Sequence, residues 1–242
     1  MKKTAIVTGS SKGIGRAIAI RLGKDGHNIV VNYSSNKDTA LEVVKEIEDS
    51  GGSAIAIKAD VSKMSEVSAL FDAGESEYGS IDILVNNAGI MSLHTIEEFT
   101  EETFDRILDV NLKGTFNSLQ CAATRLNNGG SIINLTSSAI ALGIPGYAVY
   151  NASKAAVESM SYTFSRELRG KNINVNCVAP GPTATDLFLT GKSEEQVENF
   201  KKMSPLERLG QPEDIAGVVS FFASTDSSWV NGQVVRANGG IV

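Results

Sequence analysis

The spacing of apolar and polar positions follows one period in some segments of the chain and a second period in others. Short runs of β-branched residues are typical of buried strands, and longer stretches with apolar positions three and four residues apart are typical of helices. In the stretch Gly13–Lys24, for example, Ile14, Ile18 and Leu22 fall on one stripe. The pattern predicts strands at Thr4–Thr8, Asn28–Asn32, Ser53–Lys58, Ile81–Val85, Ser131–Leu135, Ile173–Val178 and Gln233–Ala237. It predicts helices at Gly13–Lys24, Lys37–Ser50, Ser65–Tyr78, Glu101–Ala123, Tyr150–Arg169 and Pro212–Ala223.

This order of strands and helices sets the expected fold. Because the strands are apolar without a polar face, we expect a parallel sheet with helices on both sides. No internal repeat, low-complexity stretch or linker divides the 242 residues, and a chain of this length can bury one large core. The sequence therefore predicts an α/β fold, a Rossmann-like doubly wound parallel sheet in a single domain over residues 1–242.

The longest stretch without a predicted strand runs from Pro180 to Pro212. It contains four of the five prolines and one weakly amphipathic segment, Ser193–Met203. A long excursion from a compact fold is more often functional than filler. We expect a substrate lid at about residues 183–212, and a passive surface helix is the alternative.

A glycine-rich turn, Gly9-Ser10-Ser11-Lys12-Gly13-Ile14-Gly15, separates the first predicted strand from the first predicted helix. Glycines at this place permit a tight turn and close approach of the backbone, and the following helix N-terminus favours an anion. The turn therefore indicates a nucleotide phosphate site, although its spacing differs from Gly-x-Gly-x-x-Gly. A purely structural turn is the alternative.

The end of the second predicted strand indicates which nucleotide fits. A protein that binds NAD usually carries Asp or Glu there, for the ribose 2′-hydroxyl. This chain has Asn32-Tyr33-Ser34-Ser35-Asn36-Lys37, and its nearest carboxylate, Asp38, falls on the next predicted helix. Lys12 and Lys37 are instead suited to a 2′-phosphate, which a carboxylate would repel. We expect NADP(H).

Three polar residues form the candidate catalytic group. Tyr150 and Lys154 lie four residues apart on one predicted helix, so their side chains share a face. An ammonium close to a phenol favours the phenolate, which would bring the pKa of Tyr150 toward neutrality. Ser137 follows a predicted strand at the edge where parallel sheets bind ligands, and its hydroxyl could hold a substrate carbonyl beside Tyr150.

Composition and charge exclude several other classes of protein. The formal net charge is −6, whereas nucleic-acid binders need a basic face, so we expect no nucleic-acid partner. No apolar run reaches the roughly 18 residues of a membrane span, and we expect a cytoplasmic protein without a membrane partner. Cys121 and Cys177 are more typical of buried apolar positions than of a redox pair. Two histidines are too few to indicate a metal site, and none is predicted.

Together these motifs resemble the short-chain dehydrogenase/reductase family, in order and over essentially the whole chain. The resemblance rests on Thr8–Gly15, Asn86-Asn87-Ala88-Gly89, Asn111, Ser137, Tyr150, Lys154 and Pro180-Gly181. Within the family, the chain is most similar to bacterial 3-oxoacyl-(acyl-carrier-protein) reductases and to carbonyl reductases related to them.

The resemblance implies a role for each matching residue. Tyr150 would protonate the carbonyl oxygen as hydride arrives, Ser137 would hydrogen-bond that oxygen, and Lys154 would bind the nicotinamide ribose and lower the pKa of Tyr150. Asn111 would hold a water in a proton relay behind Lys154. The implied cofactor-binding set is Gly9, Ser11, Lys12, Gly13, Ile14, Gly15, Tyr33, Ser34, Ser35, Lys37, Asp60, Val61, Asn87, Ala88, Gly89, Tyr150, Lys154, Pro180, Gly181, Thr183 and Thr185. In this set, Asp60 and Asn87 would lie around the adenosine, and Thr183 and Thr185 would contact the carboxamide.

Two departures from the family pattern bear on the substrate. Where acyl-carrier-protein reductases usually have basic residues, this chain has Asn127–Ser131, with Arg125 close by and Arg169 and Lys171 farther along. A docking surface for an acidic carrier protein should be basic, and the corresponding surface of this chain has fewer basic residues. Near the C-terminal end Asn238 stands where the family more often has Asp, at an expected subunit contact.

Three functions therefore stay open. The first is NADPH-dependent reduction of 3-oxoacyl thioesters, and the second is general reduction of small or bulky hydrophobic carbonyl compounds. The third is a non-catalytic NADP-binding regulator, which the complete catalytic set disfavours. An apolar pocket wall is expected from Met91, Leu187, Phe188 and Leu189. The resemblance also implies a homotetramer, with candidate contacts on the late helix and at Trp229, Val230, Val234, Val235, Ile241 and Val242.

Overall fold

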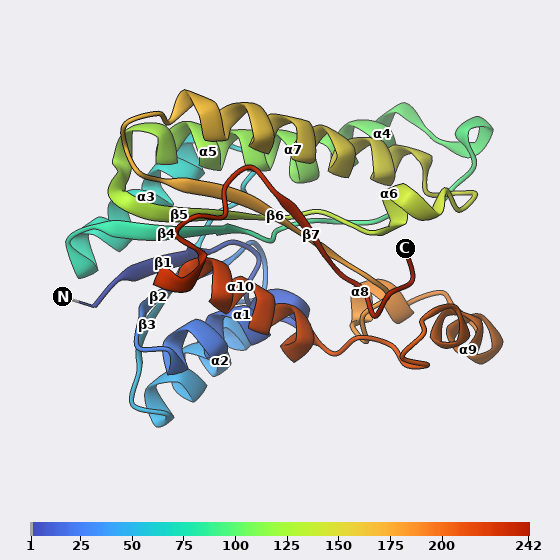
Figure 1. Ribbon diagram of the computed structural model, residues 1–242, viewed down its shortest axis with the longest axis horizontal. Coiled ribbons are helices and arrows are strands. Elements are labelled where there is room, and N and C mark those ends of the chain that lie inside the picture. Colours follow the sequence, from blue (N-terminus) through green and yellow to red (C-terminus); the bar gives the residue numbers. More distant parts are fainter. Residues whose placement is uncertain (1) are drawn as a thin grey trace.

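The computed structural model describes residues 2–242, which form one parallel sheet with helices on both faces (Figure 1). The strand order is β3-β2-β1-β4-β5-β6-β7, and every neighbouring pair is parallel. The order reverses between β1 and β4, which is the position where doubly wound sheets bind nucleotides. The strands are β1 Thr4–Val7, β2 Asn28–Tyr33, β3 Ser53–Lys58, β4 Ile81–Asn86, β5 Leu126–Leu135, β6 Asn174–Pro180 and β7 Val234–Ala237. The predicted fold is confirmed.

The helices divide into two layers, one on each face of the sheet (Figure 1). One layer contains α1 Gly13–Lys24, α2 Lys37–Asp49 and α10 Pro212–Ala223. The other contains α3 Met64–Tyr78, α4 Glu101–Leu108, α5 Gly114–Arg125 and α7 Ala148–Glu167. The remaining elements outside these two layers are η1 Ile96–Glu98, α6 Ala139–Leu142, α8 Asp186–Leu189, α9 Glu194–Met203 and η3 Thr225–Ser227.

Each layer buries its own core because side chains alternate across the strands. Val7 of β1 packs into the core under α1, α2 and α10, whereas its neighbour Ile6 packs into the core under α3 and α5. The largest fully buried side chains, Phe222 and Phe71, lie in these two cores respectively. Burial of one such side chain contributes about 1.5–3 kcal/mol, so both faces of the sheet are firmly covered.

The predicted helix Glu101–Ala123 is wrong as a single element. Between α4 and α5 the chain forms a π-helix, η2, at Asp109–Lys113. The next residue, Gly114, packs against the β3–α3 loop, and a Cβ there would lie 2.6 Å from Val61 Cγ2. An apolar period of 3.6 residues carries no sign of a wider turn, so the sequence pattern did not indicate the interruption.

Strand β5 begins five residues earlier than the predicted Ser131–Leu135. Its first residue, Leu126, pairs with Ile81, and the register then shifts before Ser131 pairs with Ile83. A Cβ at Gly130 would lie 2.6 Å from the Asp82 carbonyl oxygen, so glycine is needed where the strands cross this bulge.

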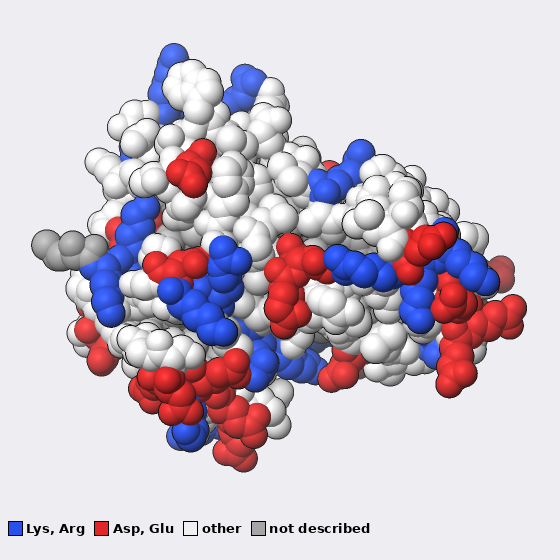
Figure 2. Space-filling view, turned by 60° about the horizontal axis from the view of Figure 1, so that its bottom comes forward, with Lys and Arg blue, Asp and Glu red and all other residues white. Residues whose placement is uncertain are grey.

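One face of the molecule carries charges of both signs. Figure 2 shows acidic and basic side chains interspersed over the face that carries α1, α2, α10 and the α8–α9 region. Cys121 and Cys177 are buried and unpaired, as expected of apolar core positions. Among the described residues, no helix combines the length and the apolar character needed to cross a membrane.

Candidate active site

The catalytic triplet predicted from the sequence comes together at the carboxyl end of β5. Ser137 follows this strand directly, and Tyr150 lies in the first turn of α7. A hydrogen bond joins the Ser137 hydroxyl and the Tyr150 phenol. The Ser137 oxygen also accepts a hydrogen bond from the Ala139 backbone N–H at 3.1 Å. The serine is thereby fixed beside the phenol, although thirteen residues separate them in the chain.

Lys154 lies one turn after Tyr150 and is almost entirely buried, with 5% of its surface exposed. Its Nζ donates a hydrogen bond to the Leu135 carbonyl oxygen at 2.8 Å. A Cβ placed on Gly89 would lie 3.4 Å from this Nζ, so the loop after β4 passes directly beside the ammonium. Burial lowers the pKa of Lys154 to about 8.

The prediction that Lys154 lowers the pKa of Tyr150 is not met. Burial raises the pKa of the Tyr150 phenol, and the hydrogen bond with Ser137 only partly opposes this. The Lys154 ammonium points instead at the Leu135 carbonyl. The phenol is therefore held protonated, which suits a proton donor.

Asn111 is the buried centre that joins three segments of the site. It lies in the π-helix η2, and its Oδ1 accepts from the Ile90 backbone N–H at 2.8 Å. Its Nδ2 donates to the Ile90 carbonyl oxygen at 3.0 Å and to Ser153 Oγ at 3.1 Å. Ser153 in turn donates to the Tyr150 carbonyl oxygen. The Asn111 side chain thus holds the loop after β4 against α7, and its role in a water relay stays a prediction.

The glycine-rich turn has the shape of a phosphate cradle. Gly9 has φ +59°, and a Cβ there would lie 2.9 Å from Ala88 Cα. At Gly15 a Cβ would lie 2.4 Å from Asn87 Nδ2, which leaves no space for a side chain. The N-terminus of α1, preceded by Lys12, has no side-chain cap. Its free N–H groups and positive dipole end therefore suit a bound phosphate.

Asn87 supports this turn rather than projecting away from it. Its Nδ2 donates to the Thr8 and Gly9 carbonyl oxygens at 2.9 and 3.0 Å. From the other side, Asn32 Oδ1 accepts from the Gly9 backbone N–H at 3.0 Å. Asn32 has no function predicted from the sequence, although a polar residue near the end of an apolar strand is a usable signal.

The predicted 2′-phosphate residues lie near the end of β2. Tyr33 ends the strand in the core, and Ser34 and Ser35 follow on the surface. Lys12 and Lys37 are both exposed, and within residues 2–242 neither forms an ion pair. Two unpaired cations beside a turn without carboxylates give this region a positive character.

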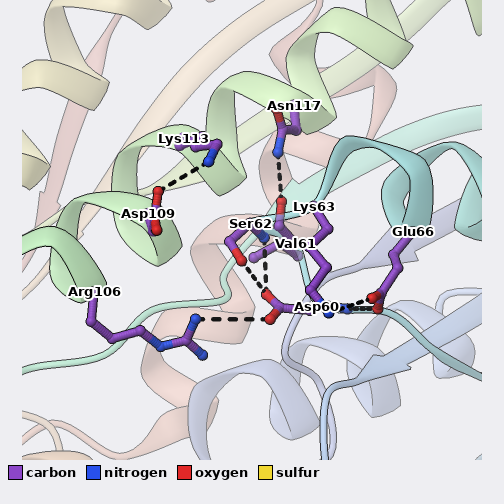
Figure 3. A network of polar contacts seen from close by, with 9 residues as sticks. All are labelled: Asp60, Val61, Ser62, Lys63, Glu66, Arg106, Asp109, Lys113 and Asn117. Atoms are coloured by element: carbon purple, nitrogen blue, oxygen red, sulfur yellow. Dashed lines mark hydrogen bonds and ion pairs between the residues drawn. The ribbon is translucent and has the colours of Figure 1, made fainter. Parts of the chain in front are cut away.

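Asp60, which follows β3, is the centre of a polar network that reaches to α4 (Figure 3). Its Oδ1 accepts from the Ser62 backbone N–H at 3.0 Å and from Ser62 Oγ at 2.7 Å. Its Oδ2 lies 3.8 Å from Arg106 Nη1, and its backbone N–H donates to Glu66. Burial raises the pKa of the Asp60 carboxyl, but the Ser62 hydrogen bonds and the Arg106 charge together lower it.

The same network continues along the interrupted helix (Figure 3). Lys113 Nζ pairs with Asp109 Oδ1 at 3.1 Å within the π-helix. Asn117 Nδ2 donates to the Val61 carbonyl oxygen at 2.9 Å. The segment that carries Asn111 is therefore attached to the loop that carries Asp60 and Val61.

Thr185, at the end of the segment that follows β6, lies beside the glycine-rich turn. A Cβ on Gly13 would lie 3.5 Å from Thr185 Cγ2. Thr183 is buried and forms an isolated parallel bridge with Gly210. The Ala184 N–H donates to the Gly210 carbonyl oxygen at 2.8 Å, so both ends of the predicted lid are joined at its base.

Inside the lid, the predicted amphipathic segment forms helix α9, with a capping box between Ser193 and Gln196. Phe188 of α8 packs edge-on against Phe200 of α9, with ring centroids 5.1 Å apart. Leu187 and Leu189 are exposed. The expected apolar wall is thus divided, because Phe188 joins the two lid helices while its neighbours face outward.

The structure explains Asn238, which stood out from the family pattern. Its Nδ2 donates to Ser138 Oγ at 3.1 Å, and its Oδ1 accepts from the Gly240 N–H. The Ser138 hydroxyl proton is already given to the Ala179 carbonyl oxygen. An ionised Asp has no donor for this contact, so the amide is the fitting side chain. Asn238 lies behind the site, against the segments after β5 and β6.

Comparisons with known proteins agree with this geometry. A family model described as enoyl-(acyl-carrier-protein) reductase matches residues 9–242. A short-chain type dehydrogenase/reductase of Picea abies is 48% identical, over 99% of this chain and 92% of its own length. An NADPH-dependent aldehyde reductase of Arabidopsis thaliana is 46% identical over 98% and 93%. A 3-oxoacyl-[acyl-carrier-protein] reductase of Staphylococcus epidermidis is 42% identical over 100% and 99%.

Solved structures are similar over the same length. An angucycline C-6 ketoreductase with bound NADP superposes with a TM-score of 0.94 at 40% identity, covering 99% of this chain and 95% of that one. A short-chain dehydrogenase/reductase of Serratia marcescens has a TM-score of 0.94 at 34% identity, covering 99% of this chain and 97% of that one.

Among residues 2–242, no group of three or more His, Cys, Asp or Glu is placed to hold a metal ion.

Proposed function

Because the chain belongs to the short-chain dehydrogenase/reductase family, we propose that it is an NADPH-dependent reductase of 3-oxoacyl thioesters or similar ketones. It is an oxidoreductase that acts on carbonyl groups, and the proposed product is a secondary alcohol. One observation carries the proposal: Ser137, Tyr150 and the buried Lys154 converge at the edge of the sheet beside a glycine cradle.

The residues of this chain fit the cofactor at both ends. Gly9 and Gly15 leave the space that a Cβ would fill, at the uncapped N-terminus of α1. When bound, the reduced nicotinamide supplies the hydride. Thr185, which lies beside the turn, and the backbone at Thr183 are proposed to hold its carboxamide, and Lys154 its ribose. Lys12 and Lys37 are proposed to bind the 2′-phosphate and to favour NADPH over NADH.

The protein residues then provide acid catalysis and charge stabilisation. Ser137 Oγ holds the substrate oxygen and stabilises negative charge as it develops there. Tyr150 donates its phenolic proton to the same oxygen, so that a neutral alcohol results. The buried Lys154 ammonium, one helical turn after Tyr150, is proposed to hold the nicotinamide ribose beside the reacting carbonyl. Asn111 is a positioning residue, because it fixes Ser153 and the loop after β4 around Lys154.

A second candidate function, reduction of free aldehydes and ketones, is favoured by the surface around β5. Arg125 has only 20% of its side chain exposed and donates to Asp72 and Glu75 at 2.6 Å each. Lys171 donates to the Ala123 carbonyl oxygen. Basic side chains that already form ion pairs or hydrogen bonds within the protein are less available to bind an acidic carrier protein. The NADPH-dependent aldehyde reductase relatives support the same alternative.

A rate comparison tests both candidates. Purified protein is assayed with acetoacetyl thioester and with a panel of free ketones and aldehydes, each with NADPH and NADH. Faster turnover of the thioester supports the first candidate, and faster turnover of free carbonyls supports the second. Equal rates with NADH contradict the role of Lys12 and Lys37. If Tyr150→Phe retains the full rate, the catalytic assignment is wrong.

Two further expectations belong to this proposal. We propose a homotetramer because apolar side chains remain on the surface of one chain, including Trp229 at 98% exposure and Phe221 of α10. Light scattering during size-exclusion chromatography measures the assembly, and a monomeric mass contradicts it. The cytoplasmic location stays a prediction.

A further inference from the structure

Tyr147 places a second phenol next to the catalytic one. It is the residue before α7, three positions ahead of Tyr150, so both rings emerge on the same side of the helix. The ring centroids lie 6.3 Å apart with an interplanar angle of 77°, an edge-to-face pair. Tyr147 is also buried, with 7% of its surface exposed. The proposed mechanism uses Tyr150 and leaves this phenol without a role.

The Tyr147 hydroxyl is unusual because it has no partner. Within residues 2–242, no hydrogen bond to this oxygen is formed. The ring is buried, but the oxygen is not among the fully enclosed polar atoms that lack a partner, so it reaches open space beside Tyr150. A phenol that is fixed by its ring and open at its hydroxyl is available to a bound ligand.

The backbone holds Tyr147 firmly in this place. Its N–H donates to the Ile144 carbonyl oxygen at 3.2 Å, and its own carbonyl accepts from the Asn151 N–H at 2.8 Å. The preceding residue, Gly146, accepts from the His94 N–H at 3.2 Å, which ties this turn to the loop that follows β4. A side chain fixed by its backbone on both sides can select a ligand geometry.

We propose that Tyr147 determines substrate specificity by donating a hydrogen bond to a second oxygen of the substrate, β to the reacting carbonyl. The inference rests on the proposed function and narrows its substrate class to 3-oxo esters, 3-oxo thioesters and other 1,3-dicarbonyl compounds. The reacting oxygen is held by Ser137 and Tyr150, so an acceptor for the adjacent phenol must be a different atom nearby. Burial raises the pKa of Tyr147, which keeps the phenol protonated and able to donate.

Such a contact should discriminate between substrates. A site that hydrogen-bonds a substrate oxygen disfavours the analogue that lacks it, because a bound analogue covers the donor without offering it an acceptor. Ethyl acetoacetate carries the second oxygen, and 2-hexanone is a comparable methyl ketone without it. The informative quantity is the ratio of kcat/KM for these two substrates with NADPH, because a general defect in the site cancels in the ratio.

The test compares wild-type protein with Tyr147→Phe and Tyr147→Gln. We expect Tyr147→Phe to lower the ratio about tenfold, through KM and kcat of ethyl acetoacetate, and Tyr147→Gln to restore part of it because the amide donates. The matched control is Tyr162→Phe on the same helix, where the ring is 50% exposed and bonded to Arg166, and the ratio should not change. Circular dichroism melts confirm that each variant folds.

The outcomes separate this inference from the proposed function. If wild-type protein reduces neither compound nor any other carbonyl in the panel, the proposed function fails. If wild-type protein is active and Tyr147→Phe leaves the ratio unchanged, the specificity role is wrong while the proposed function stands. Should Tyr147→Phe fail to fold, an unchanged ratio in Tyr147→Gln overturns the role in the same way.

Discussion

The catalytic group and the Asp60 network use the same kinds of charged and polar side chains in opposite surroundings. Lys154 is 5% exposed and donates to a backbone carbonyl inside the protein. Arg106, by contrast, has 54% of its side chain exposed and reaches Asp60 across 3.8 Å (Figure 3). Both regions are anchored to the interrupted helix, one through Asn111 and the other through Arg106.

The free-energy effect of a charged side chain depends on whether it is buried or exposed. An exposed ion pair is worth about 0–1 kcal/mol because water solvates both partners. A buried charge costs several kcal/mol unless polar groups compensate it. Substitutions at the catalytic group should therefore change activity and stability strongly, and substitutions in the exposed network should change them little.

The largest expected effect is the loss of activity when the buried ammonium is removed. Lys154→Met keeps the length of the side chain and removes its charge, so the proposed contact with the nicotinamide ribose beside Tyr150 is lost. We expect kcat to fall about 10²-fold or more, because a misplaced nicotinamide slows hydride transfer. Steady-state rates with NADPH measure this, and a variant that retains a tenth of wild-type kcat would contradict the comparison.

The second effect is a pH dependence of stability. The pKa of Lys154 is lowered from 10.5 to about 8 by burial, so between these values the unfolded chain binds more protons than the folded one. Stability from this group therefore rises as pH increases from 8 to 10.5, by roughly 3 kcal/mol in total. The measurement is the unfolding free energy of wild type minus that of Lys154→Met across this range. A difference that stays constant with pH would contradict the buried ammonium.

Asn111→Ala should have the third largest effect. It removes three hydrogen bonds and leaves the N–H and carbonyl of Ile90 without their partner. We expect a loss of about 2–4 kcal/mol in unfolding free energy, because unpaired buried groups cost about 1–3 kcal/mol each. Urea denaturation measures this loss. Asn117→Ala removes a single hydrogen bond to the Val61 carbonyl and is the smaller matched change.

The smallest effect should come from the exposed network. Arg106→Gln removes the charge beside Asp60, and we expect KM for NADPH to rise about two- to fivefold with kcat unchanged, as a contact worth under about 1 kcal/mol allows. Lys113→Gln, which breaks the nearby exposed pair with Asp109, should leave KM within error. Equal changes in both variants would show that Arg106 does not act through Asp60.

Much of the fold could be predicted because it depends on local periodicity. The strand before the glycine-rich turn was placed within one residue, Thr4–Thr8 against β1 Thr4–Val7, and helix α1 was placed without error. A short apolar strand and an amphipathic helix carry their signals in their own residues. The π-helix at Asp109–Lys113 was not predicted because a single wider turn leaves no mark in the apolar period. The residue that follows it, Gly114, packs against Val61 of a distant segment.

In the candidate site, too, some features follow from local sequence and others from contacts with distant segments. The spacing of Tyr150 and Lys154 on one helix places both side chains on one face in any context. The direction of the Lys154 ammonium toward Leu135, and the resulting pKa values, depend on desolvation by distant segments. The same holds for Asn238, whose donor role appears only when Ser138, a hundred residues away, lies against it.

The parallel sheet, its helical layers, the glycine-rich turn and the side chains available for catalysis could all be recognised in the chain alone. Steric limits on the backbone and the burial of periodic apolar residues act over a few neighbouring residues, so their signals are local. The contacts between polar groups, their loss of water and the position of a second phenol, Tyr147, beside Tyr150 appear only in the folded protein. Hydrogen bonding and desolvation depend on atoms that are close in space, and those atoms come from segments far apart in the sequence.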